Sequence, residues 1–490
     1  MKHITILFLL LICLMGCSDD DLIVNPPNKL GSSEVITSNA DLRKAVNAVY
    51  SMMISTSYYG SFYLTSGDML GDDAIVPEFA SGSRSSYFTY DWTKAYTSTS
   101  LYAVAYGAIA HINDVLIRSE SLENTDTKIA LLAEIKALRA IIHFDVAKLY
   151  GPLPVNLGKG KIKDDALCIP KMDKVKLQND YEGMLRVSVH EIYKFITEEL
   201  EAALPYMPKG KVQGTLGQDG VKAALSRIYL YMGKYDLAYK YAKQLISDPT
   251  TYSILSIDSY VDSWGKAFSS ESIFELVINE ANGMSYSSIG WIVNADKLAA
   301  RGMAKSRRFE TLMDQDLNDV RNDLFELYTD PIKGSGYLPS KKYPGISDVF
   351  YNNIKVFRLS EIYLIASECL LKSENLQDKS EAARLLNLIR DNRTTTNPHK
   401  YNASSITILD VLHERRLELF AEGHRAWDLW RNQMSVIRWN SLVDKELGYS
   451  NDKSDGVIEF DDYKNIFPID ESQLELLPEK DRKAQQNPGY

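Results

Sequence analysis

The sequence predicts a mostly α-helical protein in which paired helices pack against a loop-rich, irregular part with few short strands. Three observations lead to this fold class. Apolar residues recur at three- and four-residue spacing over much of the 490-residue chain, which is the period of an amphipathic helix. Two segments read as antiparallel helix pairs. The region between these pairs is rich in Tyr, Gly and Ser and has no sustained helical period.

The first half of the chain carries four predicted helices. The first covers residues 41–53, where Leu42, Val46, Val49 and Met53 follow the helical spacing and Asn39 or Asp41 stands in the capping position. The polar, glycine-rich stretch from Tyr58 to Asp91 predicts long loops. The other three predicted helices are residues 101–119, residues 128–151, which stop at Gly151-Pro152, and residues 187–208.

Residues 221–249 predict two helices joined at Gly233. Gly233, Tyr235, Ala238 and Tyr241 have the spacing found in the second half of a tetratricopeptide repeat, so this helix pair is predicted to be tetratricopeptide-like. Residues 356–393 predict a similar pair. The spacing between the two pairs is irregular, and such pairs bury their apolar faces only by stacking on neighbouring elements.

The region between the two helix pairs, residues 251–355, predicts mostly loops. One strand is predicted over residues 272–279. Long loops in a helical body are uncommon unless they are functional. This region is therefore predicted to be a variable ligand region, between an N-terminal part (31–250) and a C-terminal part (356–490) of one domain.

The N-terminus predicts export and lipid anchoring. A short basic start precedes an apolar run that is too short to span a bilayer as a mature helix. Residues 14–17, Leu-Met-Gly-Cys, resemble a bacterial lipobox, which makes residues 1–16 a signal peptide and Cys17 the lipidated residue of an acidic tether over 17–30. An ordinary signal peptide with an incidental cysteine is the alternative.

Composition excludes or disfavours several classes of function. A net charge of −10 argues against broad nucleic-acid binding, which usually needs a basic face. No later segment is long and apolar enough to cross a membrane. Cys168 and Cys369 lie too far apart in sequence to indicate a disulfide framework, so both are predicted to be free and buried. The 30 tyrosines suit core packing and ligand binding alike.

Sequence motifs for common chemistry are absent. None of the 7 histidines forms an HxxxH or HExxH pair, and there is no nucleophile elbow or P-loop. Paired carboxylates for glycoside hydrolysis remain open, because they can be distant in sequence. The conspicuous candidates are Asp72-Asp73 and the acids of residues 414–428.

The stretch from Glu414 to Arg431 holds the highest density of charged and aromatic residues. Leu417, Phe420, His424 and Trp427 follow the stripe of a core-facing helix, and Gly423 predicts a kink or a change of helix. Each acid has a basic residue within three or four positions, so the charges are predicted to pair along the helix. A structural network is the favoured interpretation, with ligand contact or catalysis as alternatives.

Five ordered motifs resemble the SusD/RagB family of outer-membrane nutrient-binding lipoproteins. They run from residues 134–155 to the terminal Gln-Asn-Pro-Gly-Tyr, and together with the lipobox they cover essentially the whole chain. The motifs are "EIKALRAIIHFDVAKLYGPLPV", "VKAALSRIYLYMGKYDLA", "FRLSEIYLIASECL", "RRLELFAEGHRAWDLWR" and "NIFPIDESQLELLPEKDRKAQQNPGY".

The resemblance implies a non-catalytic, lipid-anchored protein on the surface of the outer membrane. Such a protein captures a glycan and delivers it to a SusC-like TonB-dependent transporter. Peptide capture of the RagB type is the close alternative. A surface glycoside hydrolase and a purely structural tetratricopeptide-like protein are alternatives from other classes. No cofactor is expected, and whether a calcium ion orders a loop is left open.

In this family the signature helices are skeleton, and ligands meet variable loops. A sugar ring stacks its apolar face on an aromatic side chain, while its hydroxyls bond nearby polar groups. The loops of this chain offer two aromatic sets, with Trp264 as a weaker candidate. The predicted ligand-binding residues are Trp92, Tyr90, Asp72 and Arg84 in the first set, and Trp291 and Tyr286 in the second.

Overall fold

The computed structural model describes most of the chain after the predicted tether. The described residues are 36–76, 85–95, 100–175, 181–283, 287–294, 302–329, 336–345, 351–396, 400–438 and 457–490. The predicted signal peptide and tether, with Cys17, and the predicted site residues Arg84 and Tyr286 lie outside these ranges.

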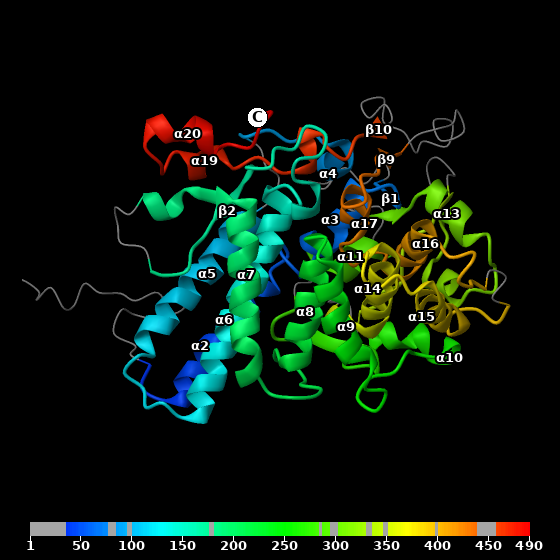
Figure 1. Ribbon diagram of the computed structural model, residues 1–490, viewed down its shortest axis with the longest axis horizontal. Coiled ribbons are helices and arrows are strands. Elements are labelled where there is room, and N and C mark those ends of the chain that lie inside the picture. Colours follow the sequence, from blue (N-terminus) through cyan, green and yellow to red (C-terminus); the bar gives the residue numbers. More distant parts are fainter. Residues whose placement is uncertain are drawn as a thin grey trace, which may run out of the picture.

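The described structure is mostly helical, as predicted (Figure 1). Its α-helices are α2 (Asn39–Met53), α3 (Phe62–Leu70), α4 (Ser85–Thr89), α5 (Leu101–Arg118), α6 (Asp126–Tyr150), α7 (Val189–Ala203), α8 (Gln218–Tyr231), α9 (Tyr235–Ile246), α10 (Ile257–Tyr260), α11 (Ile289–Val293), α13 (Arg307–Met313), α14 (Leu359–Lys372), α15 (Lys379–Asp391), α16 (Ile408–Glu418), α17 (Arg425–Trp430), α19 (Glu471–Leu474) and α20 (Glu479–Gln485).

The strands form short antiparallel pairs. They are β1 (Ala74–Ile75) with β5 (Ala304–Lys305), β2 (Leu167–Pro170) with β3 (Arg186–Ser188), β4 (Ser272–Leu276) with β8 (Ile354–Arg358), β6 (Tyr328–Thr329) with β7 (Gly336–Tyr337), and β9 (Val436–Ile437) with β10 (Val457–Ile458). The predicted strand over 272–279 is confirmed as β4, and its partner β8 was not predicted.

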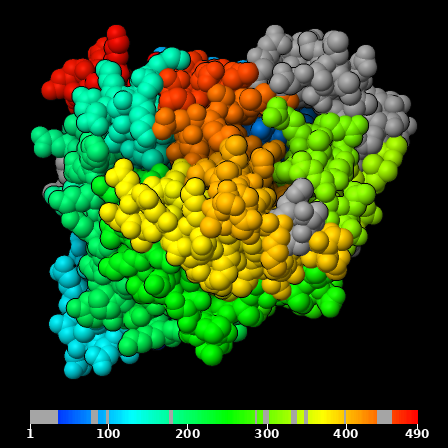
Figure 2. Space-filling model, turned by 45° about the vertical axis from the view of Figure 1, so that its right-hand side comes forward, coloured from blue at the N-terminus to red at the C-terminus, as the bar shows by residue number. Residues whose placement is uncertain are grey.

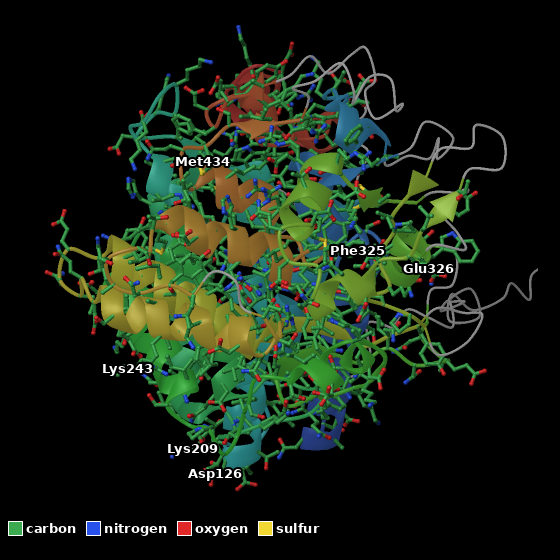
Figure 3. The ribbon with its side chains drawn as sticks, turned by 90° about the vertical axis from the view of Figure 1, so that its right-hand side faces the viewer. Asp126, Lys209, Lys243, Phe325, Glu326 and Met434 are labelled. Carbon is green, nitrogen blue, oxygen red and sulfur yellow. The ribbon has the colours of Figure 1, made fainter. Side chains whose placement is uncertain are left out.

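The N-terminal layer consists of α2, α5, α6 and α7, which lie side by side (Figure 1). α6 begins where the Thr125 hydroxyl accepts a hydrogen bond from the Lys128 backbone N–H, and it ends before Gly151, as predicted. Asp126, its first residue, lies at the opposite end of the molecule from Met434, just after α17 (Figure 3). The C-terminal end of this helix therefore reaches the end of the molecule where α17 lies.

The two predicted helix pairs are confirmed as α8 with α9 and α14 with α15. Both pairs contain the same short link between their helices. The Ser226 hydroxyl of α8 donates to the carbonyl of Ala238 in α9, at 3.1 Å. The Ser367 hydroxyl of α14 donates to the carbonyl of Ala382 in α15, at 2.9 Å. Small residues at these positions let the helices approach closely, which supports the reading as degenerate repeats.

The prediction of long loops over residues 58–91 is wrong in part, because α3, β1 and α4 lie within this stretch. α3 is buried along its whole length. Its polar residues are typical of a loop, which is why the sequence predicted one here. Thr65 and Ser66 bond backbone carbonyls of the preceding turn. A Cβ added at Gly67 would lie 2.5 Å from the carbonyl carbon of Gly423, so this glycine allows α3 to touch the turn before α17.

The segment from α14 to α17 lies across one face of the molecule, in yellow to orange (Figure 2). α16 and α17 are separate helices, which confirms the predicted change of helix. Gly423 between them has a φ of +82°, a left-handed conformation that favours glycine. The C-terminal segment then returns to α6, where the Phe467 backbone N–H donates to the Leu149 carbonyl at 2.9 Å. None of the described helices is long and apolar enough to cross a membrane.

Candidate functional site

Trp92 is packed in an aromatic cluster beside the C-terminal segment. Its ring centroid lies 4.9 Å from that of Tyr90 and 4.9 Å from that of Phe467. Its indole N–H donates to the hydroxyl of the C-terminal residue, Tyr490, at 2.7 Å. Only 3% of Trp92 is exposed. These contacts favour a packing role, and ligand contact by Trp92 stays a prediction.

Tyr90 and Asp72 are also engaged by the protein itself. The Tyr90 hydroxyl donates to the Leu70 carbonyl at 2.5 Å. Asp72 accepts two hydrogen bonds from Arg425, at 2.6 and 3.1 Å. Burial alone would raise the pKa of the Asp72 carboxyl, but the guanidinium groups of Arg425 and Arg416 outweigh burial and lower this pKa to about 2. Both predicted contacts therefore have structural partners.

Trp291 is the predicted site residue that keeps the most exposure among those described. It lies in the short helix α11, whose first turn is capped by the Ser288 hydroxyl, an acceptor for the Trp291 backbone N–H at 3.3 Å. The side chain is half-buried. Among the described residues, the aromatic rings that pack against Trp92 are those of Tyr87, Tyr90 and Phe467, and Trp291 is not one of them.

The signature stretch is a buried network of charges, as predicted, but its partners differ from the prediction. Glu418 accepts hydrogen bonds from Arg393, which follows α15, at 2.9 Å and from Arg358, at the end of β8, at 3.0 Å. Arg358 also bonds Glu422, at 2.7 and 2.8 Å. Most pairs therefore join different elements. The network clamps β8, α15 and α16 together.

The carboxylates of this network are poorly suited to acid catalysis. Burial alone would raise the pKa of Glu418, but Arg393 and Arg358 lower it well below its ordinary value. Arg415 and Arg431 likewise lower the pKa of Asp428 against the effect of burial. A general acid needs a raised pKa so that it holds a proton near neutral pH. These carboxylates instead stay charged and paired.

The described residues contain no group of three or more metal-binding side chains close enough to hold an ion. Cys168 and Cys369 are buried, and within the described ranges neither forms a disulfide. Burial raises the pKa of the Cys168 thiol to about 12. Neither thiol is therefore suited to be a nucleophile.

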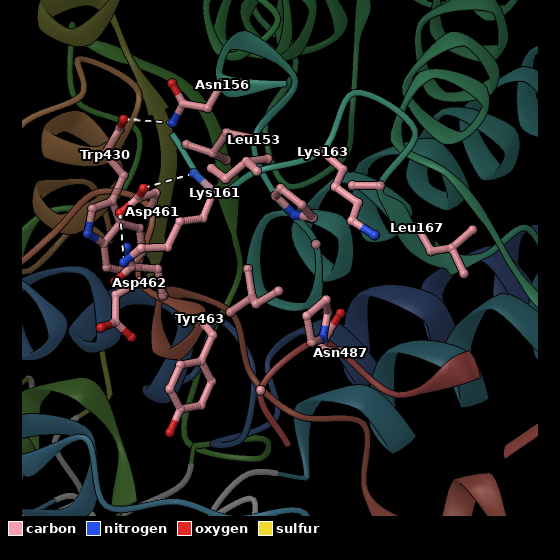
Figure 4. Close-up of a pocket in the computed structure, with 18 of the residues that line it drawn as sticks. Leu153, Asn156, Lys161, Lys163, Leu167, Trp430, Asp461, Asp462, Tyr463 and Asn487 are labelled. Atoms are coloured by element: carbon pink, nitrogen blue, oxygen red, sulfur yellow. Dashed lines mark hydrogen bonds and ion pairs between the residues drawn. The ribbon is translucent and has the colours of Figure 1, made fainter. Parts of the chain in front are cut away.

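A cavity of about 540 Å³ lies where three distant segments meet. The segments are the loop after α6, helix α17 and the C-terminal residues from 460 on (Figure 4). Leu153 and Asn156 come from the first, Trp430 from the second, and Tyr463 and Asn487 from the third. Small-molecule sites commonly measure about 300–1,000 Å³ and are mainly apolar with a few polar groups. The cavity meets this description.

Sequence reasoning missed the cavity because no single segment carries it. All three of its walls include parts of the family motifs, "GPLPV" after α6, "AWDLW" in α17 and "QNPGY" at the end of the chain, which indicate the family but not the cavity. Asn487 gives one wall its shape, since its side-chain amide donates to the carbonyls of Tyr150 and Phe467 at 2.9 and 2.7 Å. The available signal was the polar Asn487 directly before Pro488-Gly489.

Two family models match the chain. Residues 337–490 match the SusD family, and residues 22–230 match a family described as starch-binding and associating with the outer membrane. Among relatives, SusD-like protein P2 of Formosa agariphila is 23% identical over 479 residues, which cover 88% of this chain and 91% of that protein.

Solved structures are similar over nearly the whole chain. A SusD superfamily protein from Bacteroides vulgatus is 28% identical with a TM-score of 0.80, covering 93% of this chain and 99% of the other. Surface glycan-binding protein A from Bacteroides thetaiotaomicron, in complex with laminarihexaose, is 18% identical with a TM-score of 0.67, covering 92% and 100%. The second likeness shows the fold alone. The two family matches and the similarity over nearly the whole chain support a SusD-like protein.

Proposed function

We propose that this protein is a surface-exposed lipoprotein that captures oligo- or polysaccharide and delivers it to a SusC-like TonB-dependent transporter of the outer membrane. The observation that carries the proposal is the similarity of nearly the whole chain to SusD-like proteins, one of whose family models is described as starch-binding and associating with the outer membrane. A related fold that has been solved with laminarihexaose supports a glycan as the ligand class.

The proposed role is binding without catalysis. The acids that the sequence offered for glycoside hydrolysis are committed elsewhere in the described structure. Asp72 and Asp73 pair with Arg425 and Arg416, and Glu418 pairs with three arginines. A retaining or inverting hydrolase needs two carboxyls free to meet the substrate, one of them with a raised pKa.

The proposed anchor is a lipid on Cys17. Several acyl chains on one residue give lasting membrane attachment, which one chain does not. Growth of expressing cells with labelled palmitate should label the wild-type protein and should not label the Cys17→Ala variant. Labelling of both proteins would contradict the assignment of Cys17.

The proposed ligand class is tested by affinity electrophoresis of the purified full chain through gels that contain single polysaccharides. The proposal predicts retardation by at least one glycan and no release of reducing ends from it. Binding of peptides with no retardation by any glycan would favour the RagB-like alternative. Release of reducing ends by the purified protein would favour a hydrolase.

The proposed partner is tested by co-purification in detergent with the β-barrel transporter whose gene should lie beside this one. Recovery of a stable complex would support delivery to the transporter. Recovery of the protein alone, with the barrel intact in the same extract, would contradict it.

A further inference from the structure

Two glycines with left-handed backbone, Gly160 and Gly489, allow close approach of the segments beside the 540 Å³ cavity. Gly160 has a φ of +56°, and a Cβ there would overlap the Asp461 carboxylate. Gly489 has a φ of +96°, and a Cβ there would overlap the Tyr463 ring. The Asp461 side chain also accepts the backbone N–H of Lys161 at 2.9 Å.

The charged side chains that line the cavity are of both signs: Lys148, Lys161, Lys163 and Arg186 beside Asp165, Asp461 and Asp462. Lys161 pairs with Asp461, with Nζ and Oδ1 3.7 Å apart, as Figure 4 shows. The buried Lys148 and Arg186 donate to the carbonyls of Gly423 and Cys168, at 3.2 and 2.6 Å, and Asp462 accepts the backbone N–H of Lys464 at 2.8 Å. An anion would meet the three carboxylates and a cation would meet the four basic groups, so this mixed lining favours a neutral ligand.

Three residues of the lining carry polar atoms that are buried and have no hydrogen-bond partner within the described part of the chain. They are the indole N–H of Trp430, which is a donor, and the side-chain oxygens of Asn156 and Asn465, which are acceptors. Asn156 and Trp430 are neighbours, since the Asn156 amide donates to the Trp430 carbonyl at 2.8 Å. Trp430 is 3% and Asn156 1% exposed.

A hydroxyl group both donates and accepts, so it can serve either kind of unpaired atom. The lining is otherwise mainly apolar, and Tyr463 at the mouth is 42% exposed, so part of its ring remains accessible to a ligand. A molecule with an apolar ring face and a fringe of hydroxyls matches both features. A pyranose has this chemistry.

We propose that this cavity seats one end of a short neutral oligosaccharide, with Tyr463 as the stacking surface at its mouth and Asn156, Trp430 and Asn465 as hydroxyl partners. The inference rests on the proposed glycan-binding function and assigns a location to the binding site. That location lies outside the loops around Trp92 and Trp291, to which the sequence assigned binding.

The test is isothermal titration of the purified full chain, in detergent, with maltohexaose, laminarihexaose, cellohexaose and mannohexaose. The hexasaccharide that binds is then titrated into three variants. Ala484→Trp adds a large side chain at an exposed position of α20 on the cavity lining. Tyr463→Ala removes the aromatic ring at the mouth. Tyr206→Ala is the matched control, because Tyr206 is 57% exposed and does not line the cavity.

The inference predicts that the dissociation constant rises about tenfold or more for Ala484→Trp and for Tyr463→Ala, and less than about twofold for Tyr206→Ala. Melting temperatures close to wild type show that the variants are folded. Equal affinity of wild type and Ala484→Trp would overturn the cavity assignment and leave the proposed function intact. Binding of peptides, but of no saccharide, would overturn both, as would a wild type that binds neither.

Discussion

Arg425 and Asp72 form a buried ion pair, with Nε and Oδ1 2.6 Å apart, although 353 positions separate them in sequence. The pair joins the loop after α3 to the first residue of α17. Arg425 also lies 3.4 Å from Asp73, which in turn pairs with Arg416 of α16. The contact ties an N-terminal loop to the signature stretch, and it accounts for the charges of that stretch as part of the skeleton.

Arg425→Ala is expected to lower the free energy of unfolding by about 3–5 kcal/mol, because it leaves Asp72 buried without its main partner. Chemical denaturation measures this change. Arg384→Ala is the control, since the Arg384–Glu381 pair is exposed and such pairs contribute about 0–1 kcal/mol. The skeleton assignment also predicts unchanged glycan affinity of the folded Arg425→Ala protein. A large affinity loss at unchanged stability would contradict it.

Gly67→Ala is expected to destabilise the protein by about 1–3 kcal/mol or more, because the new methyl group would press on the backbone of Gly423 and His424. Gly107→Ala is the matched control substitution, and it is expected to stabilise the protein. Gly107 lies on the exposed side of α5 with nothing within 4 Å of an added Cβ, and alanine is the better helix former by about 1 kcal/mol. Thermal melting of both variants, measured in parallel, tests whether the added methyl group meets neighbouring backbone at Gly67 and open space at Gly107.

The Asp72 carboxyl predicts a specific acid sensitivity. Its pKa in the folded protein is about 2, below the value of 3.8 expected for an ordinary aspartate. A carboxyl with a lowered folded pKa adds stability that is full above the unfolded pKa and is lost as the pH falls through the folded pKa.

The free energy of unfolding should therefore differ between wild type and Asp72→Asn by a constant amount from about pH 7 to pH 5. This difference between the two proteins should decrease by about 2 kcal/mol as the pH falls from about 4 to about 2. Denaturant titrations of both proteins at each pH give the difference. A difference that does not change with pH would mean that Asp72 does not carry the charge assigned to it.

Trp92→Ala and Trp291→Ala distinguish a packing role of each side chain from a ligand-binding role, when stability and glycan affinity are both measured. Trp92 is 3% exposed, so its loss should cost about 3–5 kcal/mol of stability. Trp291 is half-buried, and its loss should cost less. If the sequence-based assignment of Trp291 to the ligand is right, its variant should lose glycan affinity while it stays folded. Wild-type stability with weaker binding in Trp92→Ala would contradict the packing role of Trp92.

Helical periodicity was enough to predict most of the long helices of this fold. α2, α5, α7, α9 and α15 bury one face at helical spacing, and Gly151 and Gly233 mark clear ends. α3 was missed because its residues are buried on every side, so it has no polar face that would show a helical period. Its Thr, Ser and Gly residues are there for close contact and local bonding, which looks like a loop in sequence.

The site was harder to predict than the fold. Aromatic residues in apparent loops drew attention to Trp92, but the return of the C-terminal segment buries that ring against Phe467 and Tyr490. Such burial depends on contacts between residues almost 400 positions apart. The cavity likewise joins three distant segments, and spacing within one segment does not reveal it. The charged network was recognised as structural, yet its partners on β8 and after α15 could not be read from one helix.

The most direct test of the central claim measures binding and cleavage on the same sample. The purified full chain is titrated with each hexasaccharide and with soluble starch, and the mixture is then assayed for new reducing ends. The wild-type protein is expected to give a saturable binding isotherm for at least one glycan and no increase in reducing ends after prolonged incubation. Absence of binding to every glycan, or release of reducing ends that follows the protein concentration, would contradict it.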